Sequence, residues 1–259
     1  MRKPAWVIEK ERGRRAAAAA TVWLFGLHAV RDALINPARE RLRLIVTRNA
    51  ADRLAEAIAV AGIEPEIADA RKFPAPLDPG SVHQGAALEV RPLDWGRPEA
   101  VCAPAGARAL AVVLDRVSDP NNAGAILRSA EVFGARAVIA TARHAAPETG
   151  SLAKTASGAL ERQPYLRVRN LVEALEELRA MGYVALGLDG AADITLAEGL
   201  AQAGPEVPIA LVLGAEGPGL RPSTRDACDT LVRIEAAGPF GSLNVSNAAA
   251  VALYAARSF

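Results

Sequence analysis

The sequence predicts an α/β fold built on a mostly parallel sheet covered on both faces. In the second half of the chain, apolar runs with the length of buried strands alternate with helical segments, as is typical of parallel sheets. About half of the 259 residues are apolar, few are aromatic and alanine is abundant, which favours close packing of helices on a sheet. Ligands of such sheets bind at the carboxyl ends of the strands, so a site is expected in the loops there.

A smaller alternating unit is predicted ahead of this sheet, over residues 21–91. Its expected elements are helices at 27–34 and 52–61, strands at 42–47 and 63–68, and a last strand within 81–90. His83 lies at the mouth of the last strand and is interpreted as a loop residue without assigned chemistry, because no cysteine or second histidine is near it.

The predicted domains are joined and preceded by segments of different composition. Residues 92–107 are rich in proline and lack periodicity, which predicts a linker. Residues 1–20 form a basic tail that is either solvated and mobile or adds phosphate contacts to an RNA-binding face. The remaining residues, 108–259, form the second domain. Its expected elements are strands at 109–115, 137–140, 183–189, 208–214 and 230–235, helices at 122–133 and 171–181, and a final helix.

Charge and cysteine content limit the classes of function. The net charge is +1, so contact with nucleic acid must come from local patches. Cys102 and Cys228 are far apart in sequence, which predicts reduced thiols in a cytoplasmic protein and no metal site. Residues 14–30 mimic a secretion signal, but Gly26 and His28 interrupt the apolar run. We interpret the run as the start of the folded domain, with secretion as the lesser alternative and no membrane span.

The first informative loop is LDRVSDPNNAGAILRSAEVFGA, at the end of the strand 109–115. Asp119 to Asn122 have the signature of a turn and a helix N-cap, and a structural role needs no more than that. Arg128 follows among small and apolar neighbours. Such an arginine either reaches out to solvent or pairs with an anion. Because its helix starts at the ligand edge, a phosphate-facing role is favoured.

The second loop is LVLGAEGPGLRPSTRDAC. Its glycines do not have the spacing of a dinucleotide fingerprint, and no phosphate-binding Gly-Lys-Ser/Thr motif is present. Glu216 stands between glycines directly after a buried strand. Its carboxylate could stabilise a cation, cap the next helix or hold an arginine.

The third loop lies in IEAAGPFGSLNVSNAAAVALYAA, where Ser242, Asn244, Ser246 and Asn247 follow a Gly-Pro-Phe-Gly loop and precede a helix. Capping of that helix accounts for one or two of these residues, so a ligand site is favoured over a cap alone. The three loops offer neither a nucleophilic triad nor a metal cluster. This set of side chains is typical of group transfer from a bound donor, with the protein positioning the reactants.

These three segments, in this order, resemble the SpoU/TrmH family of RNA ribose 2'-O-methyltransferases in the SPOUT class. The matching stretches are DPNNAGAILRSAEVFGA, LVLGAEGPGL and IEAAGPFGSLNVSNAAAVALYAA. FGLHAVRDAL and VHQGAALEV look like the family's small substrate-binding domain, similar to a ribosomal-protein L30e-like fold. The resemblance covers nearly the whole chain and points to the subgroup that methylates a guanosine in large-subunit (23S) rRNA.

The resemblance implies S-adenosylmethionine as cofactor, bound at a deep trefoil knot, and a homodimer whose knots pack together. The residues alone predict an open sheet instead, because chains rarely thread loops. Carried over by motif position, Asn122, Arg128, Glu216, Ser242 and Asn244 would be catalytic. The cofactor would be bound by Leu213, Gly214, Gly217, Ile234, Ser242 and Leu243. Pro239, Phe240 and Gly241 depart from the family pattern, so the loop before Ser242 is expected to be shaped differently.

The implied reaction is attack of a ribose hydroxyl on a sulfonium methyl group. A neutral guanidine is costly, so Arg128 is favoured as a clamp on the adjacent phosphate and not as the base. Further RNA contacts are expected from four basic residues, Lys154, Arg162, Arg167 and Arg169. For each of them, the alternative is a place on a solvated polar face without RNA contact.

Three other functions stay open. Within the favoured class, a tRNA guanosine is the competing substrate. A non-catalytic RNA-binding scaffold is the second alternative, and the presence of Arg128, Glu216, Ser242 and Asn244 argues against it. A nucleotide-binding oxidoreductase is the third, and the missing dinucleotide fingerprint argues against that.

Overall fold

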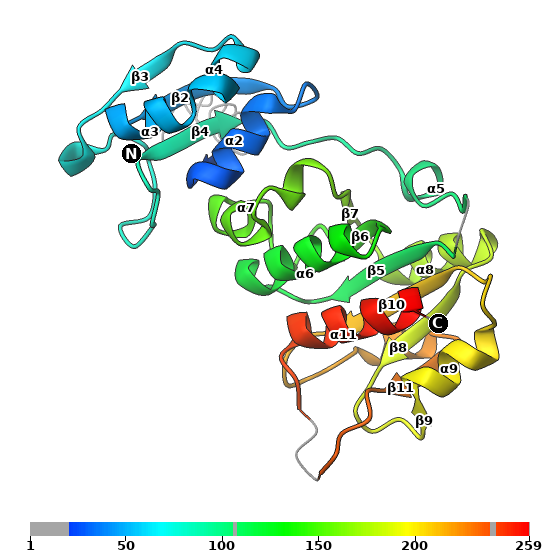
Figure 1. The fold of residues 1–259 in the computed structure, drawn as a ribbon. Helices are drawn as coiled ribbons and strands as arrows, with labels where there is room; N and C mark the ends of the chain where they lie inside the picture. The colour runs from blue at the N-terminus through cyan, green and yellow to red at the C-terminus, as the bar shows by residue number, and fades with distance from the viewer. Residues whose placement is uncertain (1–20, 106–107, 239–241, 259) are drawn as a thin grey trace, which may run out of the picture. The chain divides into compact units, whose positions relative to one another are not determined.

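The structure, a computed structural model, describes residues 21–105, 108–238 and 242–258 (Figure 1). The predicted basic tail and the departure at residues 239–241 lie outside these ranges. The chain divides into two compact units, one of Met1–Asp94 with Glu148–Lys154 and one of Trp95–Pro147 with Thr155–Phe259. The segment 148–154, which the sequence grouped with the second domain, thus packs in the first unit.

The first unit is a four-stranded sheet in the order β1-β4-β2-β3, with helices α2 and α4 packed on each other. β4 pairs antiparallel with β1 and β2, and β2 pairs parallel with β3. Its elements are β1 (Val22–Phe25), α2 (Leu27–Ile35), β2 (Arg41–Val46), α3 (Arg48–Arg53), α4 (Ala55–Ala61), β3 (Pro65–Ile67), the 3₁₀-helix η1 (Ala70–Lys72) and β4 (Ala86–Val90). The single helix predicted over 52–61 is wrong in extent, because two short helices meet at Leu54, whose φ of −105° and ψ of 6° are not helical.

The last three residues of the loop before β4, His83, Gln84 and Gly85, each have a structural role. Gln84 Oε1 accepts a hydrogen bond from the first N–H of α2, at Leu27, over 3.1 Å. His83 stacks on Phe73 with ring centroids 4.1 Å apart. Gly85 has a φ of +79°, and a Cβ there would lie 2.4 Å from Thr47 Oγ1. These contacts account for the three residues without a ligand.

A buried ion pair ties the segment 148–154 into the first unit. Arg39 Nη1 lies 2.8 Å from Glu148 Oε1, and the two side chains are 0% and 14% exposed. The same nitrogen donates to the Arg91 carbonyl at 2.7 Å. Nearby, a Cβ on Gly150 would lie 2.4 Å from the Trp23 carbonyl oxygen, so the backbones approach closely.

Replacing Glu148 with alanine is expected to lower the free energy of unfolding by roughly 3 kcal/mol, because the buried Arg39 guanidinium loses the carboxylate that lies 2.8 Å from it. Urea denaturation measures the loss. The control is Glu66→Ala, which breaks the exposed Arg43–Glu66 pair and should change stability little. Equal losses in both variants would contradict the assignment of Arg39–Glu148 as the stabilising pair.

The second unit is a seven-stranded sheet in the order β7-β6-β5-β10-β8-β11-β9, and all its paired strands run parallel. The prediction of a mostly parallel sheet is confirmed. Its elements are α5 (Pro98–Val101), β5 (Leu110–Asp115), α6 (Pro120–Val132), β6 (Ala135–Thr141), the 3₁₀-helix η2 (Ala159–Glu161), β7 (Tyr165–Val168), α8 (Leu171–Ala180), β8 (Val184–Leu188), β9 (Ile194–Thr195), α9 (Leu196–Ala203), β10 (Ile209–Gly214), α10 (Pro222–Asp226), β11 (Thr230–Arg233) and α11 (Val245–Ser258). Helix α7 (Gly150–Ala156) begins in the first unit.

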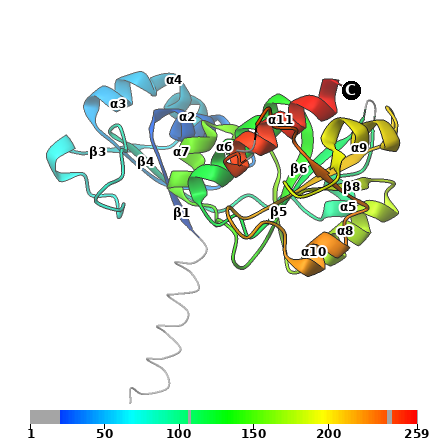
Figure 2. The same ribbon diagram turned by 90° about the horizontal axis from the view of Figure 1, so that it is seen from below.

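Helices cover both faces of this sheet. α6, α9 and α11 lie on one side, and α5, α8 and α10 lie on the other (Figure 2). Every residue of β5 is buried, as the apolar run predicted, and Leu171, Leu175 and Leu178 of α8 join the core on one face. With both faces covered, the ends of the strands remain accessible, and the loops singled out in the sequence stand at the carboxyl ends.

Several short elements differ from the prediction. The predicted linker contains α5, which starts at Pro98, a residue suited to a first helical turn. α6 starts at Pro120, two residues earlier than predicted, because Asp119 caps it by accepting from the Asn121 N–H at 2.9 Å. The sequence did not predict β7 or β9. β7 has only four residues, one of them an arginine, and β9 has only two residues, so neither gives a clear apolar pattern.

Residues 22–30 of the run that mimics a secretion signal form β1 and the start of α2. Within the described ranges, no helix is long and apolar enough to cross a membrane. Both cysteines are free, and burial raises the pKa of Cys102 to about 11 and that of Cys228 to about 12.

Candidate functional site

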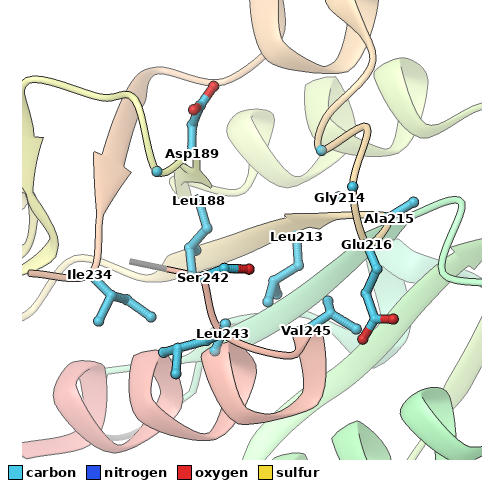
Figure 3. Close-up of a pocket in the computed structure, with 14 residues that line it drawn as sticks. Leu188, Asp189, Leu213, Gly214, Ala215, Glu216, Ile234, Ser242, Leu243 and Val245 are labelled. Carbon is cyan, nitrogen blue, oxygen red and sulfur yellow. The ribbon is translucent and has the colours of Figure 1, made fainter. Parts of the chain in front are cut away.

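The three loops singled out in the sequence lie at one edge of the second unit's sheet. They follow β5, β10 and β11, and parallel strands bring their carboxyl ends to a common edge. The loop after β8 joins them there. A cavity of about 480 Å³ opens between the loops that follow β8, β10 and β11 and the start of α11 (Figure 3).

The wall of this cavity is apolar at its centre and acidic in two places. Figure 3 shows the side chains of Leu213, Ile234, Leu243 and Val245 arranged around it. The full lining is Leu188, Asp189, Gly190, Leu213, Gly214, Ala215, Glu216, Gly217, Gly219, Ile234, Ser242, Leu243, Val245 and Ala248. All six residues that the resemblance assigned to the cofactor are in this wall.

Glycines let the β10 loop fold tightly against the cavity. The Gly219 N–H donates to the Ala215 carbonyl at 3.0 Å, which closes a short turn. A Cβ on Gly214 would lie 2.1 Å from the carbonyl carbon of Gly219, so only glycine fits there. Gly217 and Gly219 have φ values of +83° and +70°, which other residues rarely adopt. At its glycines the loop therefore presents backbone to the wall, and Glu216 between them presents its side chain.

Three predicted site residues from three distant segments form one hydrogen-bonded cluster. Asn122 Nδ2 donates to Glu216 Oε1 at 3.2 Å, and Asn244 Nδ2 donates to Asn122 Oδ1 at 3.0 Å. Asn244 Nδ2 also donates to Glu216 Oε1. The carboxylate thus orders two amides at the edge of the cavity.

Asn244 is at the same time the cap of α11. Its Oδ1 accepts from the Ser246 N–H at 2.8 Å and from the Ser246 hydroxyl at 2.6 Å. Capping and site geometry thus use different atoms of one side chain. The third loop therefore caps α11 and, through Ser242 and Leu243, also lines the cavity.

Arg128 lies apart from this cluster. It is exposed on α6, six residues beyond Asn122, which is about 9 Å along a helix axis. It makes no hydrogen bond or ion pair with any residue in the described ranges, and it does not line the cavity. Its guanidinium is open to a ligand or to another chain.

The predicted RNA-contacting residues have different surroundings. Arg162 pairs with Glu131. Arg167 donates to the carbonyls of Ala146 and Ala142, the latter at 3.0 Å, so it holds a loop together. Arg169 is exposed at the end of β7. Lys154 belongs to the first unit.

Two acidic residues at this edge were not predicted. Asp189 lines the cavity and pairs with Arg225 at 3.1 Å. Asp115 is fully buried at the end of β5 and accepts from both the N–H and the Nε of Arg221, at 2.9 and 2.7 Å. Each is the last residue of a predicted strand. The rule that ligands bind at the carboxyl ends of parallel strands could therefore have identified both.

The cavity suits a nucleoside-sized ligand with a positive charge. Its volume falls within the usual range for small-molecule sites, which are mostly apolar with a few polar groups. The backbone of the glycine loop supplies hydrogen-bonding groups, and Glu216 supplies negative charge, whereas Asp189 is already paired with Arg225. No group of three or more histidine, cysteine or acidic side chains suited to a metal occurs among the residues that the structure describes.

Comparison with known proteins agrees with this architecture. Residues 109–254 match the profile of the SpoU rRNA Methylase family, and residues 23–95 match that of RNA 2'-O ribose methyltransferase substrate binding. The crystal structure of the SpoU methyltransferase AviRb from Streptomyces viridochromogenes, in complex with the cofactor AdoMet, superposes with a TM-score of 0.76 at 25% identity. The match covers 95% of this chain and 92% of that one.

Sequence relatives point the same way. The 23S rRNA (guanosine-2'-O-)-methyltransferase RlmB of Ralstonia nicotianae is 47% identical over 147 residues, 57% of each chain. An uncharacterized tRNA/rRNA methyltransferase of Mycobacterium sp. (strain KMS) is 43% identical over 176 residues, 67% of this chain and 55% of that one. The chain thus spans little more than half the length of these curated relatives.

The family profile covers more than half of the chain and includes all three loops at the edge of the sheet. The resemblance stated from the motifs is therefore confirmed, whereas the knot stays a prediction. The chain belongs to the SpoU rRNA methylase family.

Proposed function

We propose that this protein transfers a methyl group from S-adenosylmethionine to the ribose 2'-hydroxyl of a guanosine in 23S rRNA. The observation that carries the proposal is the hydrogen-bonded cluster of Asn122, Glu216 and Asn244 beside an apolar cavity. These residues come from the three motifs shared with the family. Residues 108–259 would perform the reaction, and residues 21–91 would bind RNA.

The cavity residues fit the cofactor. An adenosine needs apolar walls with backbone donors and acceptors, which Leu213, Ile234, Leu243 and the glycine loop offer. The sulfonium and ammonium groups need negative charge, which Glu216 offers in the wall. Ser242 adds a hydroxyl to the wall. When bound, S-adenosylmethionine supplies an electrophilic methyl group.

The cluster would position the ribose for in-line attack. Glu216 fixes both amides by accepting from them, so Asn122 and Asn244 are held without reorganisation during the reaction. Asn244 is fixed a second time because it caps α11. Arg128, which has no partner among the described residues, would hold the phosphate next to the target ribose through its planar fork of donors.

The choice of 23S rRNA is supported by the relative from Ralstonia nicotianae and by the substrate-binding match over residues 23–95. A tRNA guanosine is the competing substrate, since other relatives are described as tRNA/rRNA methyltransferases. The test is transfer of label from S-adenosylmethionine to unmodified 23S rRNA and to unmodified tRNA transcripts, assayed separately. Label in 23S rRNA alone is expected; label in tRNA alone would overturn the proposed substrate.

We also propose that the protein acts as a homodimer through the α6–α11 face. The two helices pack together, and Val132, Val251 and Tyr254 on them are 71%, 43% and 62% exposed. Large apolar side chains gathered on one surface are typical of an interface. A partner on this face would bring its cofactor site toward Arg128, which has no partner among the described residues.

Tyr254→Asp is expected to weaken dimerisation by roughly 30-fold or more, because a charge would be buried in an apolar contact. Light scattering after size-exclusion chromatography measures the mass. The control is Val60→Asp, which places the same charge at an apolar residue that is 71% exposed on α4. A wild-type protein that stays monomeric at micromolar concentration would contradict the dimer.

A further inference from the structure

A second cavity lies at the carboxyl edge of the same sheet and takes no part in the site described above. Its volume is about 480 Å³, and it lies at the ends of β5, β6 and β7. Arginines dominate its wall. The residues that matter are Arg116, Thr141, Arg143, His144, Arg169 and Arg221.

The charge of this cavity is positive and largely uncompensated. Arg221 is neutralised by the buried Asp115. Arg116, Arg143 and Arg169 are exposed, and none of them forms an ion pair or a side-chain hydrogen bond with a residue in the described ranges. Three guanidinium groups are thus held near one another although they repel, an arrangement that an anion would stabilise.

The backbone around the cavity is also unusual. Arg116 and His144 have φ values of +61° and +63°, a left-handed conformation that residues other than glycine rarely adopt. Two such residues in one small wall cost free energy, and strain of this kind clusters at ligand sites. If these positions served only to turn the chain, glycine would adopt the same conformation without this cost.

We infer that this cavity binds backbone phosphates of the RNA substrate. The inference rests on the proposed function for its ligand. Phosphodiester groups match the forked donors of Arg116, Arg143 and Arg169, and the open, solvent-accessible wall suits a polymer that passes across it. The strand order supports this. In the sheet, β5 and β10 lie between β6, the middle strand of this cavity, and β8, a strand of the cofactor cavity. The three strand spacings from β6 to β8 amount to about 14 Å. An RNA strand with its target ribose at the cluster would then lay a neighbouring stretch of backbone on the arginines.

The test compares two double variants that lose the same charge. Arg143→Gln/Arg169→Gln removes two unpaired guanidiniums from the cavity. The control, Arg97→Gln/Arg179→Gln, removes two arginines of the same unit that do not line it. Filter binding of an unmodified 23S rRNA transcript is measured across a salt series, and calorimetry measures the Kd for S-adenosylmethionine.

The cavity variant is expected to bind the transcript roughly tenfold more weakly, with a salt slope lower by about 1 to 2, because two phosphate contacts are lost. The control should bind RNA as the wild type does, and the cofactor Kd should stay the same in both. Arg143→Lys/Arg169→Lys should recover part of the affinity. Equal RNA affinity of the cavity variant and the control would overturn the inference. A wild type that binds RNA but transfers no methyl group would instead refute the proposed function, and the comparison of the two variants would still decide the role of the cavity.

Discussion

Replacing Arg128 with lysine is expected to reduce kcat by about 100-fold while leaving the Kd for S-adenosylmethionine unchanged. Lysine keeps the positive charge but loses the planar fork that can hold a phosphate at two points. The structure gives Arg128 no other task, since it is exposed and without a partner among the described residues. Its substitution should therefore not destabilise the fold.

Steady-state kinetics at saturating RNA, which measures kcat, separates this role from weaker binding. Arg97→Lys is the matched control, because Arg97 is another exposed arginine of the same unit. If Arg128→Lys retains the wild-type kcat, the phosphate clamp is wrong. If catalysis is lost only together with cofactor binding, Arg128 acts on the cofactor site and not on RNA.

Gly214→Ala is expected to weaken binding of S-adenosylmethionine by roughly 100-fold, comparable to misplacing a catalytic group by about 1 Å. The new Cβ would lie 2.1 Å from the carbonyl carbon of Gly219 and 2.3 Å from the Leu220 nitrogen. These are backbone atoms, so the whole turn that forms the cavity wall must move. Gly214 also lies in β10, so thermal unfolding is measured alongside.

The control for this variant is Gly80→Ala, because no atom lies within 4 Å of a Cβ at Gly80. That substitution should leave both Tm and cofactor affinity unchanged. A Gly214→Ala protein with wild-type affinity would show that the β10 turn is not part of the cofactor site. A global loss of structure would be seen in the Tm and would distinguish unfolding from a local change.

The sequence predicted the long, strongly apolar elements of the second unit and missed the short ones. β5 and β10 are buried throughout most of their length, so their composition alone marks them as strands of a covered sheet. β7 and β9 lie at the two edges of the sheet, where fewer apolar residues are required. The strand order, with β10 between β5 and β8, depends on long-range pairing that no local pattern contains.

Some features of the candidate site could be predicted from the sequence, and others could be seen only in the structure. The loop positions came from the ends of predicted strands, and the assignment of Leu213, Ile234 and Leu243 came from the family motifs. The hydrogen bonds of Asn122 and Asn244 to Glu216 join segments 94 and 28 residues apart in sequence, so they required the tertiary structure. Arg169 was predicted as an RNA contact, but the basic cavity was not, because its arginines follow four different strands and meet only in the tertiary structure.

The most direct test of the account is the chemical identity of the labelled nucleoside. After transfer from labelled S-adenosylmethionine to 23S rRNA, the RNA is digested to nucleosides and analysed by chromatography and mass spectrometry. We expect 2'-O-methylguanosine as the labelled nucleoside, and its loss in Asn244→Ala. Label on a base, or no label in the presence of measured cofactor binding, would contradict the assignment of the Asn122, Glu216 and Asn244 cluster to ribose methylation.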